Sequence, residues 1–258
     1  MGEDPGMTEL LVPERFCGPP SSGNGGWTAG TLAGLLDHDC PADHAAPWPT
    51  VQVTLRQPPP LDTPLPVSDG VAVDSAGEVV ASAEVVDREL LPVDAVTAED
   101  ADAATASYAG HLSHPFPTCF ACGTAREDGL RIFPGRVADD ADGRVRVAAP
   151  WAPDPNVAED FHLYATGEPR ASLAATWAAL DCVGGWAGDL QERLMVLGRM
   201  TARVDSLPVI GEPHVAIGGA RGRDGRKTFT ASTLLDSGGR VVAVAEHVWI
   251  AVDPAGFG

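Results

Sequence analysis

Positive charge is scarce in this sequence. Among 258 residues, 17 are Lys or Arg and 36 are Asp or Glu, which gives a formal net charge of −19. Proteins that bind nucleic acids need a basic face to displace the counterions of the phosphates, and anionic membranes attract basic segments. The composition therefore argues against a nucleic-acid partner and against docking on a membrane, and we attribute the excess of acidic residues to solubility.

Long apolar runs and export signals are also lacking. No run reaches the roughly 18 apolar residues of a transmembrane helix, so we expect none. Residues 1–10 are acidic and have neither the cationic nor the apolar region of a secretory signal. The cysteines number five, and an odd count without an export signal is typical of reduced thiols. We therefore expect a cytoplasmic protein.

Short elements separated by Gly, Pro and Asp predict an α+β fold. Helical periodicity covers residues 27–36, and strand-like alternation covers 51–55. Residues 70–74 and 78–86 flank a turn and predict a hairpin. The segment 92–118 is rich in Ala, Asp and Pro, and we interpret it as a linker with a short helix near its middle.

The second half of the chain predicts one long helix and several strands. The helix extends from Arg170 to Asp189, and we expect it to fray at Gly184 and Gly185 because glycine opposes helix formation. Good hairpin turns at 224–225 and 237–239 separate the last strands. The expected strands are 129–134, 144–149, 194–205, 213–222, 226–236 and 240–252.

The two halves repeat one order of elements. Residues 53–64 read VTLRQPPPLDTP, and residues 200–213 read MTARVDSLPVIGEP. A helix precedes each segment and a strand hairpin follows it. This order predicts two modules, over residues 1–110 and 111–258, each with a long helix laid on an antiparallel sheet. Such modules pair because an open sheet edge accepts another strand.

Three motifs stand out along the chain. Residues 16–27 read FCGPPSSGNGGW, residues 119–130 begin CFACG and end GL, and residues 177–186 read WAALDCVGGW. Together they resemble the hotdog-fold acyl-CoA thioesterase superfamily in its double-hotdog form. The resemblance implies that sheets wrap two central helices, that the two modules share one continuous sheet, and that acyl sites lie between the helices.

The sequence departs from the family pattern at two motifs. Asn24-Gly25-Gly26 stands where many single-hotdog thioesterases have His-Gly-Gly, and the second half has no Gly-Gly pair before its helix. We therefore expect one competent site. The Asp-x-Asn-Pro-x-x-His pattern of hotdog hydratases is missing, which argues against dehydratase chemistry.

The glycine pair at the start of the first predicted helix favours carbonyl chemistry. A helix N-terminus offers free N–H groups and a partial positive charge, and such donors stabilise an oxyanion by roughly 3 to 4 kcal/mol each. Gly25 and Gly26 would let a thioester carbonyl approach without a Cβ in the way. Asn24 would cap the helix or hold a water. The alternative is that the glycines only permit a tight turn or close helix–sheet packing.

Asp181 is the acid that we expect at the site. It lies on the apolar stretch 178–183, where a carboxylate is desolvated unless it is paired. The resemblance implies that this acid faces the glycine turn of the other module, where it would activate water or attack the carbonyl itself. The alternative is a structural Asp bound to backbone or Arg. Glu159, Asp160 and His162, in the preceding loop, are weaker candidates.

Other residues are candidates for substrate binding. Trp27, Trp177 and Trp186 would line an acyl pocket, although core packing is the commoner use of Trp. Arg221 and Arg223 belong to the densest basic cluster of this acidic chain and would receive a CoA phosphate. The alternative for the arginines is a solvated hairpin tip.

The cysteines give a weaker signal. His114, Cys119 and Cys122 have a spacing that offers three zinc ligands, but a fourth is not evident, and one Cys-x-x-Cys alone is weak evidence. We therefore expect no metal and no cofactor, with Cys119 and Cys122 in a structural turn. Cys182 has no His near it in the sequence and is assigned to the core.

The predicted function is hydrolysis of an acyl thioester, carried by CoA or by a carrier protein. Two alternatives stay open: a non-catalytic acyl or acyl-CoA binding protein of the same fold, and a lyase-like reaction on the same scaffold. The position of Asp181 distinguishes the hydrolase from the binding protein. A carboxylate near the glycine N–H groups favours the hydrolase, and one locked to an arginine favours the binding protein. A double hotdog contains its own dimer-like interface, so both a monomer and a homodimer are compatible with it.

Overall fold

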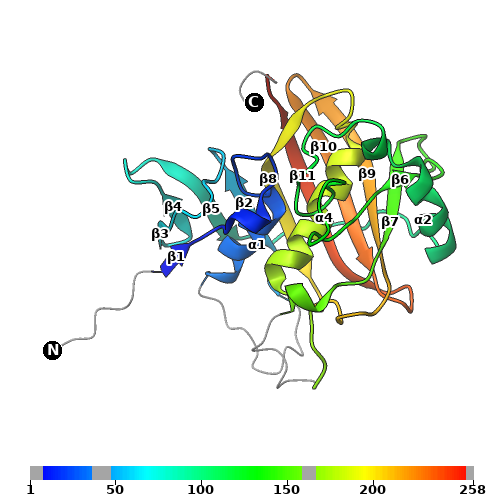
Figure 1. Cartoon of the computed structure of the whole chain (residues 1–258), viewed down its shortest axis with the longest axis horizontal. Coiled ribbons are helices and arrows are strands. Elements are labelled where there is room, and N and C mark those ends of the chain that lie inside the picture. Colours follow the sequence, from blue (N-terminus) through cyan, green and yellow to red (C-terminus); the bar gives the residue numbers. More distant parts are fainter. Residues whose placement is uncertain (1–7, 37–47, 159–166, 254–258) are drawn as a thin grey trace.

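One antiparallel sheet of eleven strands organises the computed structural model, which describes residues 8–36, 48–158 and 167–253 (Figure 1). Every strand pairs antiparallel with its neighbours. In spatial order the strands are β1 (Thr8–Leu10), β3 (Leu65–Ser68), β4 (Val71–Val73), β5 (Val79–Val85), β2 (Val51–Leu55), β8 (Met195–Val204), β11 (Val241–Ala251), β10 (Lys227–Leu235), β9 (His214–Asp224), β7 (Arg146–Trp151) and β6 (Gly135–Arg136).

The pairing of β2 with β8 joins the first part of the sheet to the second. Val51 lies opposite Ala202, and Val53 lies opposite Met200. All four side chains are buried, because alternate residues of both strands point to the face that the helices cover. This pairing makes one continuous sheet from strands that are far apart in the sequence.

Two helices lie side by side on one face of the sheet (Figure 1). Helix α1 (Gly25–Gly34) packs against β2, β5 and β8, and helix α4 (Leu173–Ala187) packs against β7 to β11. Every residue of α4 is buried, which explains why its sequence is apolar except at Thr176 and Asp181. The smaller helical elements are α2 (Ala98–Ala104), η1 (Glu14–Phe16), η2 (Thr105–Ser107), η3 (Ala109–His111) and η4 (Pro155–Val157).

The two long helices cross closely because α1 presents glycine to α4. A Cβ on Gly26 would lie 2.5 Å from the Asp181 Cβ and 2.7 Å from the Trp177 carbonyl oxygen. A Cβ on Gly30, one turn further, would lie 2.8 Å from the Ala174 Cα. Gly26 therefore serves helix–helix packing. A Cβ on Gly25 would lie 2.8 Å from the Leu197 Cβ in β8, so the close helix–sheet packing that the sequence left open as an alternative is present at Gly25.

Most of the predicted elements are confirmed. The first helix, the strand 51–55, the hairpin of β4 and β5, and the last four strands are present within one or two residues of their predicted bounds. The short helix expected in the linker is α2. Two short strands at the edge, β1 and β3, were not predicted.

Two expectations about the second half are wrong. The segment 129–134 is irregular rather than a strand, and the strand begins only at Gly135. Helix α4 runs through Gly184 and Gly185 without fraying. A Cβ on Gly184 would lie 2.7 Å from the His247 Nδ1, so glycine there lets the helix approach the sheet, and burial outweighs the helix propensity of glycine.

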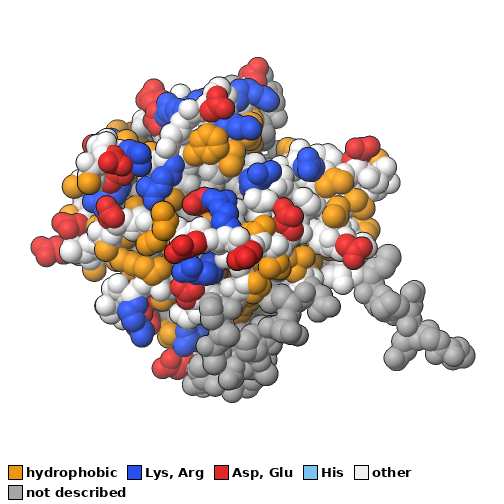
Figure 2. All heavy atoms as spheres, turned by 180° about the vertical axis from the view of Figure 1, so that it is seen from behind, with side chains coloured by type: hydrophobic (Ala, Val, Ile, Leu, Met, Phe, Trp, Pro, Cys, Tyr) orange, Lys and Arg blue, Asp and Glu red, His pale blue; other side chains and the backbone are white. Residues whose placement is uncertain are grey.

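The surface behind the helices carries mixed charge. Figure 2 shows Lys and Arg side chains interspersed with Asp and Glu on this side, with apolar side chains between them. In the described ranges, none of the helices combines the length and apolar character that a membrane crossing requires.

Candidate functional site

A cavity of about 280 Å³ lies where the start of α1 meets the middle of α4. Its walls come from the loop before α1, the segment after β2, the turn around Cys119, and strands β8 and β11. The lining is mainly apolar, with a few polar groups that converge on it, which is the usual character of a small-molecule site. The lining residues include Asn24, Gly25, Arg56, Cys119, Cys122, Asp181, Cys182, Leu197 and Trp249.

The acid of this cavity is Asp181, which lies beside the glycine turn as the resemblance implies. Its Oδ2 accepts a hydrogen bond of 2.8 Å from the Gly26 N–H, and the residue is 2% exposed. Its Oδ1 is buried without a hydrogen-bond partner. Within the described part of the chain no Lys or Arg forms an ion pair with Asp181. The carboxylate is therefore not locked to an arginine, but it is bound to backbone, as the structural alternative for this Asp expects.

Burial raises the pKa of Asp181 to about 7. The Gly26 N–H and the Asn24 side chain oppose this shift because they stabilise the charged form, and the neighbouring Cys119 adds to it. A carboxyl group with a pKa near neutrality exchanges protons readily at physiological pH, which suits a general base or acid.

The three N–H groups in the first turn of α1 differ in their hydrogen-bond partners. Asn24 is the N-cap, and its Oδ1 accepts a hydrogen bond of 2.8 Å from the Trp27 N–H. The Gly26 N–H binds Asp181, whereas the Gly25 N–H has no acceptor among the described residues. Gly25 lines the cavity. The donor available to a ligand is thus that of Gly25, and Gly26 instead orients the carboxylate.

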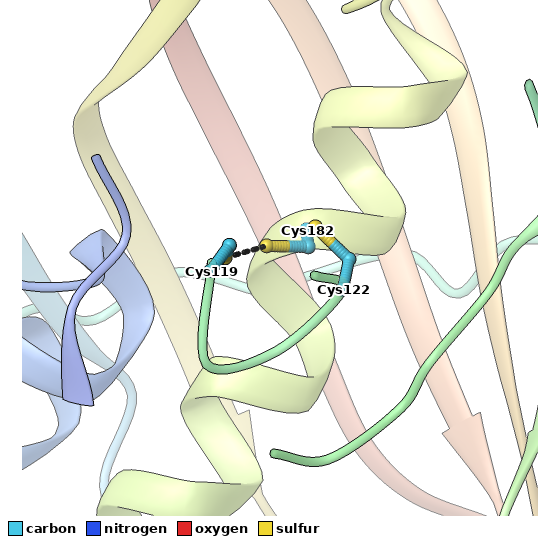
Figure 3. A group of neighbouring side chains, drawn as sticks. All are labelled: Cys119, Cys122 and Cys182. Carbon is cyan, nitrogen blue, oxygen red and sulfur yellow. Dashed lines mark hydrogen bonds between the residues drawn. The ribbon is translucent and has the colours of Figure 1, made fainter. Parts of the chain in front are cut away.

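Three cysteine side chains form a cluster at the edge of the same cavity (Figure 3). The sulfurs of Cys119, Cys122 and Cys182 all lie within 4.8 Å of one another, and Cys119 and Cys182 are 3.6 Å apart. The Asn24 Nδ2 lies 3.6 Å from the Cys119 sulfur and 3.8 Å from that of Cys182. Cys182 was assigned to the core because no His lies near it in the sequence; it is buried, and its sulfur also belongs to this cluster.

His114 does not join Cys119 and Cys122 as a possible zinc ligand, although the spacing of the three residues offered this set. Its Nε2 is 3.0 Å from the Cys122 carbonyl oxygen, and its Nδ1 accepts a hydrogen bond of 2.9 Å from the Phe116 N–H. Both ring nitrogens therefore have backbone partners. Burial also lowers the pKa of His114, so that the neutral ring is favoured.

The three candidate tryptophans lie outside the lining of this cavity. Trp27 stacks on Phe16 with ring centroids 3.4 Å apart, and Trp177 is buried between the helices. Trp186 packs edge-on against Tyr108. The tryptophan that lines the cavity is Trp249, in the last strand. The acyl-pocket role of the three tryptophans stays an untested prediction.

Arg221 and Arg223 lie at a second, more open cavity of about 550 Å³, which shares no lining residue with the first. Arg223 pairs with Asp189 at 3.2 Å. The first cavity has a basic residue of its own in Arg56, an exposed side chain directly after β2 that sequence analysis missed. Its place in the sequence, after a strand and before three prolines, did not indicate a role in binding. Glu159, Asp160 and His162 lie outside the described residues.

No protein-family model matches the sequence, and a search of curated proteins finds no match. Solved structures that share the architecture over almost the whole chain are hotdog-fold and thioesterase-superfamily proteins. A hotdog-fold protein of unknown function from Alicyclobacillus acidocaldarius aligns with a TM-score of 0.59 at 12% identity, over 98% of this chain and 96% of that one.

Two further structures also align over almost the whole of both chains. The TesB protein of Mycobacterium avium subspecies paratuberculosis aligns with a TM-score of 0.54 at 12% identity, over 95% of this chain and 91% of that one. A putative oleoyl thioesterase from Lactobacillus plantarum aligns with a TM-score of 0.53 at 10% identity, over 96% of this chain and 98% of that one. At such identities the likeness establishes the fold, which is a hotdog-type α+β fold.

Proposed function

We propose that this chain is a double hotdog that hydrolyses acyl thioesters, with acyl-CoA or an acyl-carrier thioester as substrate. The two modules are residues 1–110, with α1 and β1 to β5, and 111–258, with α4 and β6 to β11. The pairing of β2 with β8 and the crossing of the two helices support this division. Helix α2 packs against β7, so the end of the first module lies on the second.

The observation that carries the proposal is the position of Asp181. Its unpartnered Oδ1 belongs to a carboxylate that lines a mainly apolar cavity, next to the unused N–H of Gly25. A thioester carbonyl that accepts a hydrogen bond from Gly25 would have its developing negative charge at the positive end of α1. The ionised Asp181 would take a proton from a water, which attacks the carbonyl carbon.

The proton and the leaving group balance in this scheme. Water gives its oxygen to the acyl carbon and one proton to Asp181. When the tetrahedral intermediate collapses, the C–S bond breaks, and the leaving thiolate takes up a proton, which Asp181 can return. The products are a carboxylic acid and a free thiol, and the Gly26 N–H keeps the carboxylate oriented throughout.

The test is hydrolysis of a panel of acyl-CoAs by the wild type, Asp181→Asn and Asp181→Ala. We expect kcat/KM to fall at least about 100-fold in both variants. Glu192→Gln, which changes an exposed acid just beyond α4, is the matched control and should retain activity. Thermal melting of each variant separates lost chemistry from lost folding.

The alternative function is non-catalytic binding of an acyl group or acyl-CoA, which the apolar cavity supports equally. Thermal stabilisation of the wild type by an acyl-CoA that it does not hydrolyse would favour this alternative. Hydrolysis that survives both substitutions at Asp181 would retain the enzyme and refute the site.

A further inference from the structure

We propose that Cys119, Cys122 and Cys182 bind a thiophilic metal ion, with Zn²⁺ as the probe that tests the site. This inference does not depend on the proposed hydrolase activity. Zn²⁺ bonds to thiolate sulfur at about 2.3 Å, so two sulfurs on a tetrahedral ion lie roughly 3.8 Å apart. The sulfurs of Cys119 and Cys182 are 3.6 Å apart, and all three lie within 4.8 Å of one another (Figure 3). Small side-chain rotations would bring the three to one ion.

A tight turn carries two of the three ligands. The Gly123 N–H donates to the Cys119 carbonyl oxygen at 2.8 Å, which closes the turn. A Cβ on Gly123 would lie 2.5 Å from that same oxygen, so the tight turn requires glycine.

Contacts from outside the turn fix its position before any metal binds. The Tyr108 hydroxyl donates to the Cys122 carbonyl oxygen at 2.9 Å. The Phe120 N–H donates to the Cys17 carbonyl oxygen at 2.8 Å, and the Ile132 N–H donates to that of Ala121 at 3.0 Å. Because the turn is tied on both sides, the two sulfurs are held next to Cys182 on the rigid helix α4.

Two buried side-chain donors also face the cluster. The Asn24 Nδ2 approaches the sulfurs of Cys119 and Cys182. The Trp186 Nε1 is buried without an acceptor at hydrogen-bond distance. This N–H lies near the Cys122 thiol. A thiolate on a metal would give this N–H a charged acceptor, and donors of this kind stabilise metal-bound sulfur.

The cavity gives a metal ion access to the three cysteines, and one coordination position of the ion would remain open. All three cysteines line the cavity that holds Asp181, so a hydrated ion can reach them from solvent. Binding would release the thiol protons, since only thiolates coordinate the metal. Three protein ligands leave the fourth position of a tetrahedral ion for water, which is the arrangement of open rather than closed zinc sites.

The test begins with metal content. The full chain, purified under reducing conditions without chelator from cells supplied with zinc, should carry about one zinc ion per chain by elemental analysis. After removal of the metal, titration of the reduced protein with Co²⁺ should give thiolate-to-cobalt charge-transfer absorption and the visible bands of tetrahedral cobalt. Addition of Zn²⁺ should displace the cobalt and abolish both signals.

Cys→Ala variants test which cysteines bind the metal ion. Cys122→Ala and Cys182→Ala should each lower the affinity for Co²⁺ by more than about 100-fold and weaken the charge-transfer band. Cys17→Ala is the matched control, because Cys17 is a buried cysteine whose sulfur lies outside the cluster and interacts with the Thr118 carbonyl oxygen. It should retain the full signal. Circular dichroism of the metal-free proteins shows which variants are folded.

Three results would overturn the proposal. The first is a folded, reduced wild type that takes up neither Co²⁺ nor Zn²⁺. The second is a folded Cys182→Ala variant with the affinity of the wild type. The third is a disulfide between Cys119 and Cys182 in the isolated protein, followed by no metal uptake once it is reduced.

Discussion

The carboxylate of Asp181, in the middle of α4, accepts a hydrogen bond of 2.8 Å from the N–H of Gly26, in the first turn of α1. The two residues are 155 positions apart in the chain. The bond places a buried acid at the positive end of a helix and holds the two long helices in one register. Packing and the proposed chemistry therefore depend on the same contact.

A methyl group at Gly26 should loosen this contact. In Gly26→Ala the new Cβ would lie 2.5 Å from the Asp181 Cβ and 2.7 Å from the Trp177 carbonyl oxygen, so the helices must separate. We expect a loss of about 1 to 3 kcal/mol in the free energy of unfolding, measured by urea denaturation, because overpacking a tight interface costs about this much.

Gly34→Ala is the matched control for this substitution. Gly34 ends the same helix, and a Cβ there would meet only the Leu173 Cδ2 at 3.6 Å, an ordinary contact. We expect no loss of stability, or a gain of up to about 1 kcal/mol from helix propensity. Equal stability losses in both variants would contradict the close helix crossing.

Arg56 should contribute to the binding of the carrier of the thioester. It is the exposed basic residue at the rim of the Asp181 cavity, whereas Arg223 lines the other cavity and pairs with Asp189. We expect Arg56→Ala to raise KM for an acyl-CoA by about tenfold with little change in kcat, because a phosphate contact adds binding energy that is uniform along the reaction. Steady-state kinetics measure both constants.

Two comparisons test whether Arg56 acts through the phosphates of CoA. Arg56→Ala should have little effect on an acyl-pantetheine substrate, which lacks the nucleotide phosphates of CoA. Arg221→Ala and Arg223→Ala test the assignment that the sequence favoured. If they raise KM for the acyl-CoA and Arg56→Ala does not, the CoA phosphates bind at the second cavity instead.

His247 should make the fold sensitive to acid. The ring is buried, its Nδ1 lies 3.2 Å from the Thr230 hydroxyl, and burial lowers its pKa to about 3. An unfolded His titrates near pH 6.5, at about the usual value. The folded state thus favours the neutral ring, and the stability that this gives is complete above about pH 6.5 and is lost as the pH falls toward 3.

Urea denaturation across this pH range measures the effect. Each pH unit below about 6.5 should remove up to about 1.4 kcal/mol of stability through this residue. In His247→Gln the dependence should be shallower, while His111→Gln, which changes an exposed His, should behave as the wild type does. Identical slopes for all three proteins would show that His247 is not buried in its neutral form.

The sequence predicted those parts of the fold that local pattern controls. Alternation of apolar and polar residues with glycine-containing turns located β8 to β11, and the Asn-Gly-Gly motif located the start of α1 within two residues. Short irregular strands such as β1, and glycines within α4, were misjudged because tertiary packing outweighs the local preference there.

Local patterns in the sequence were sufficient to predict an α+β fold, its glycine-led first helix and an acid on the second helix, and the resemblance of three motifs implied the hotdog. Only the tertiary structure decided that the Gly26 N–H binds Asp181, while the Gly25 N–H has no acceptor among the residues that the structure describes. Likewise, only the tertiary structure brought Cys182 to Cys119 and Cys122. The physical reason is the distance along the chain. Neighbouring residues specify a turn or a helix start, whereas these contacts depend on how two helices pack on a sheet whose two parts are joined by the pairing of β2 with β8.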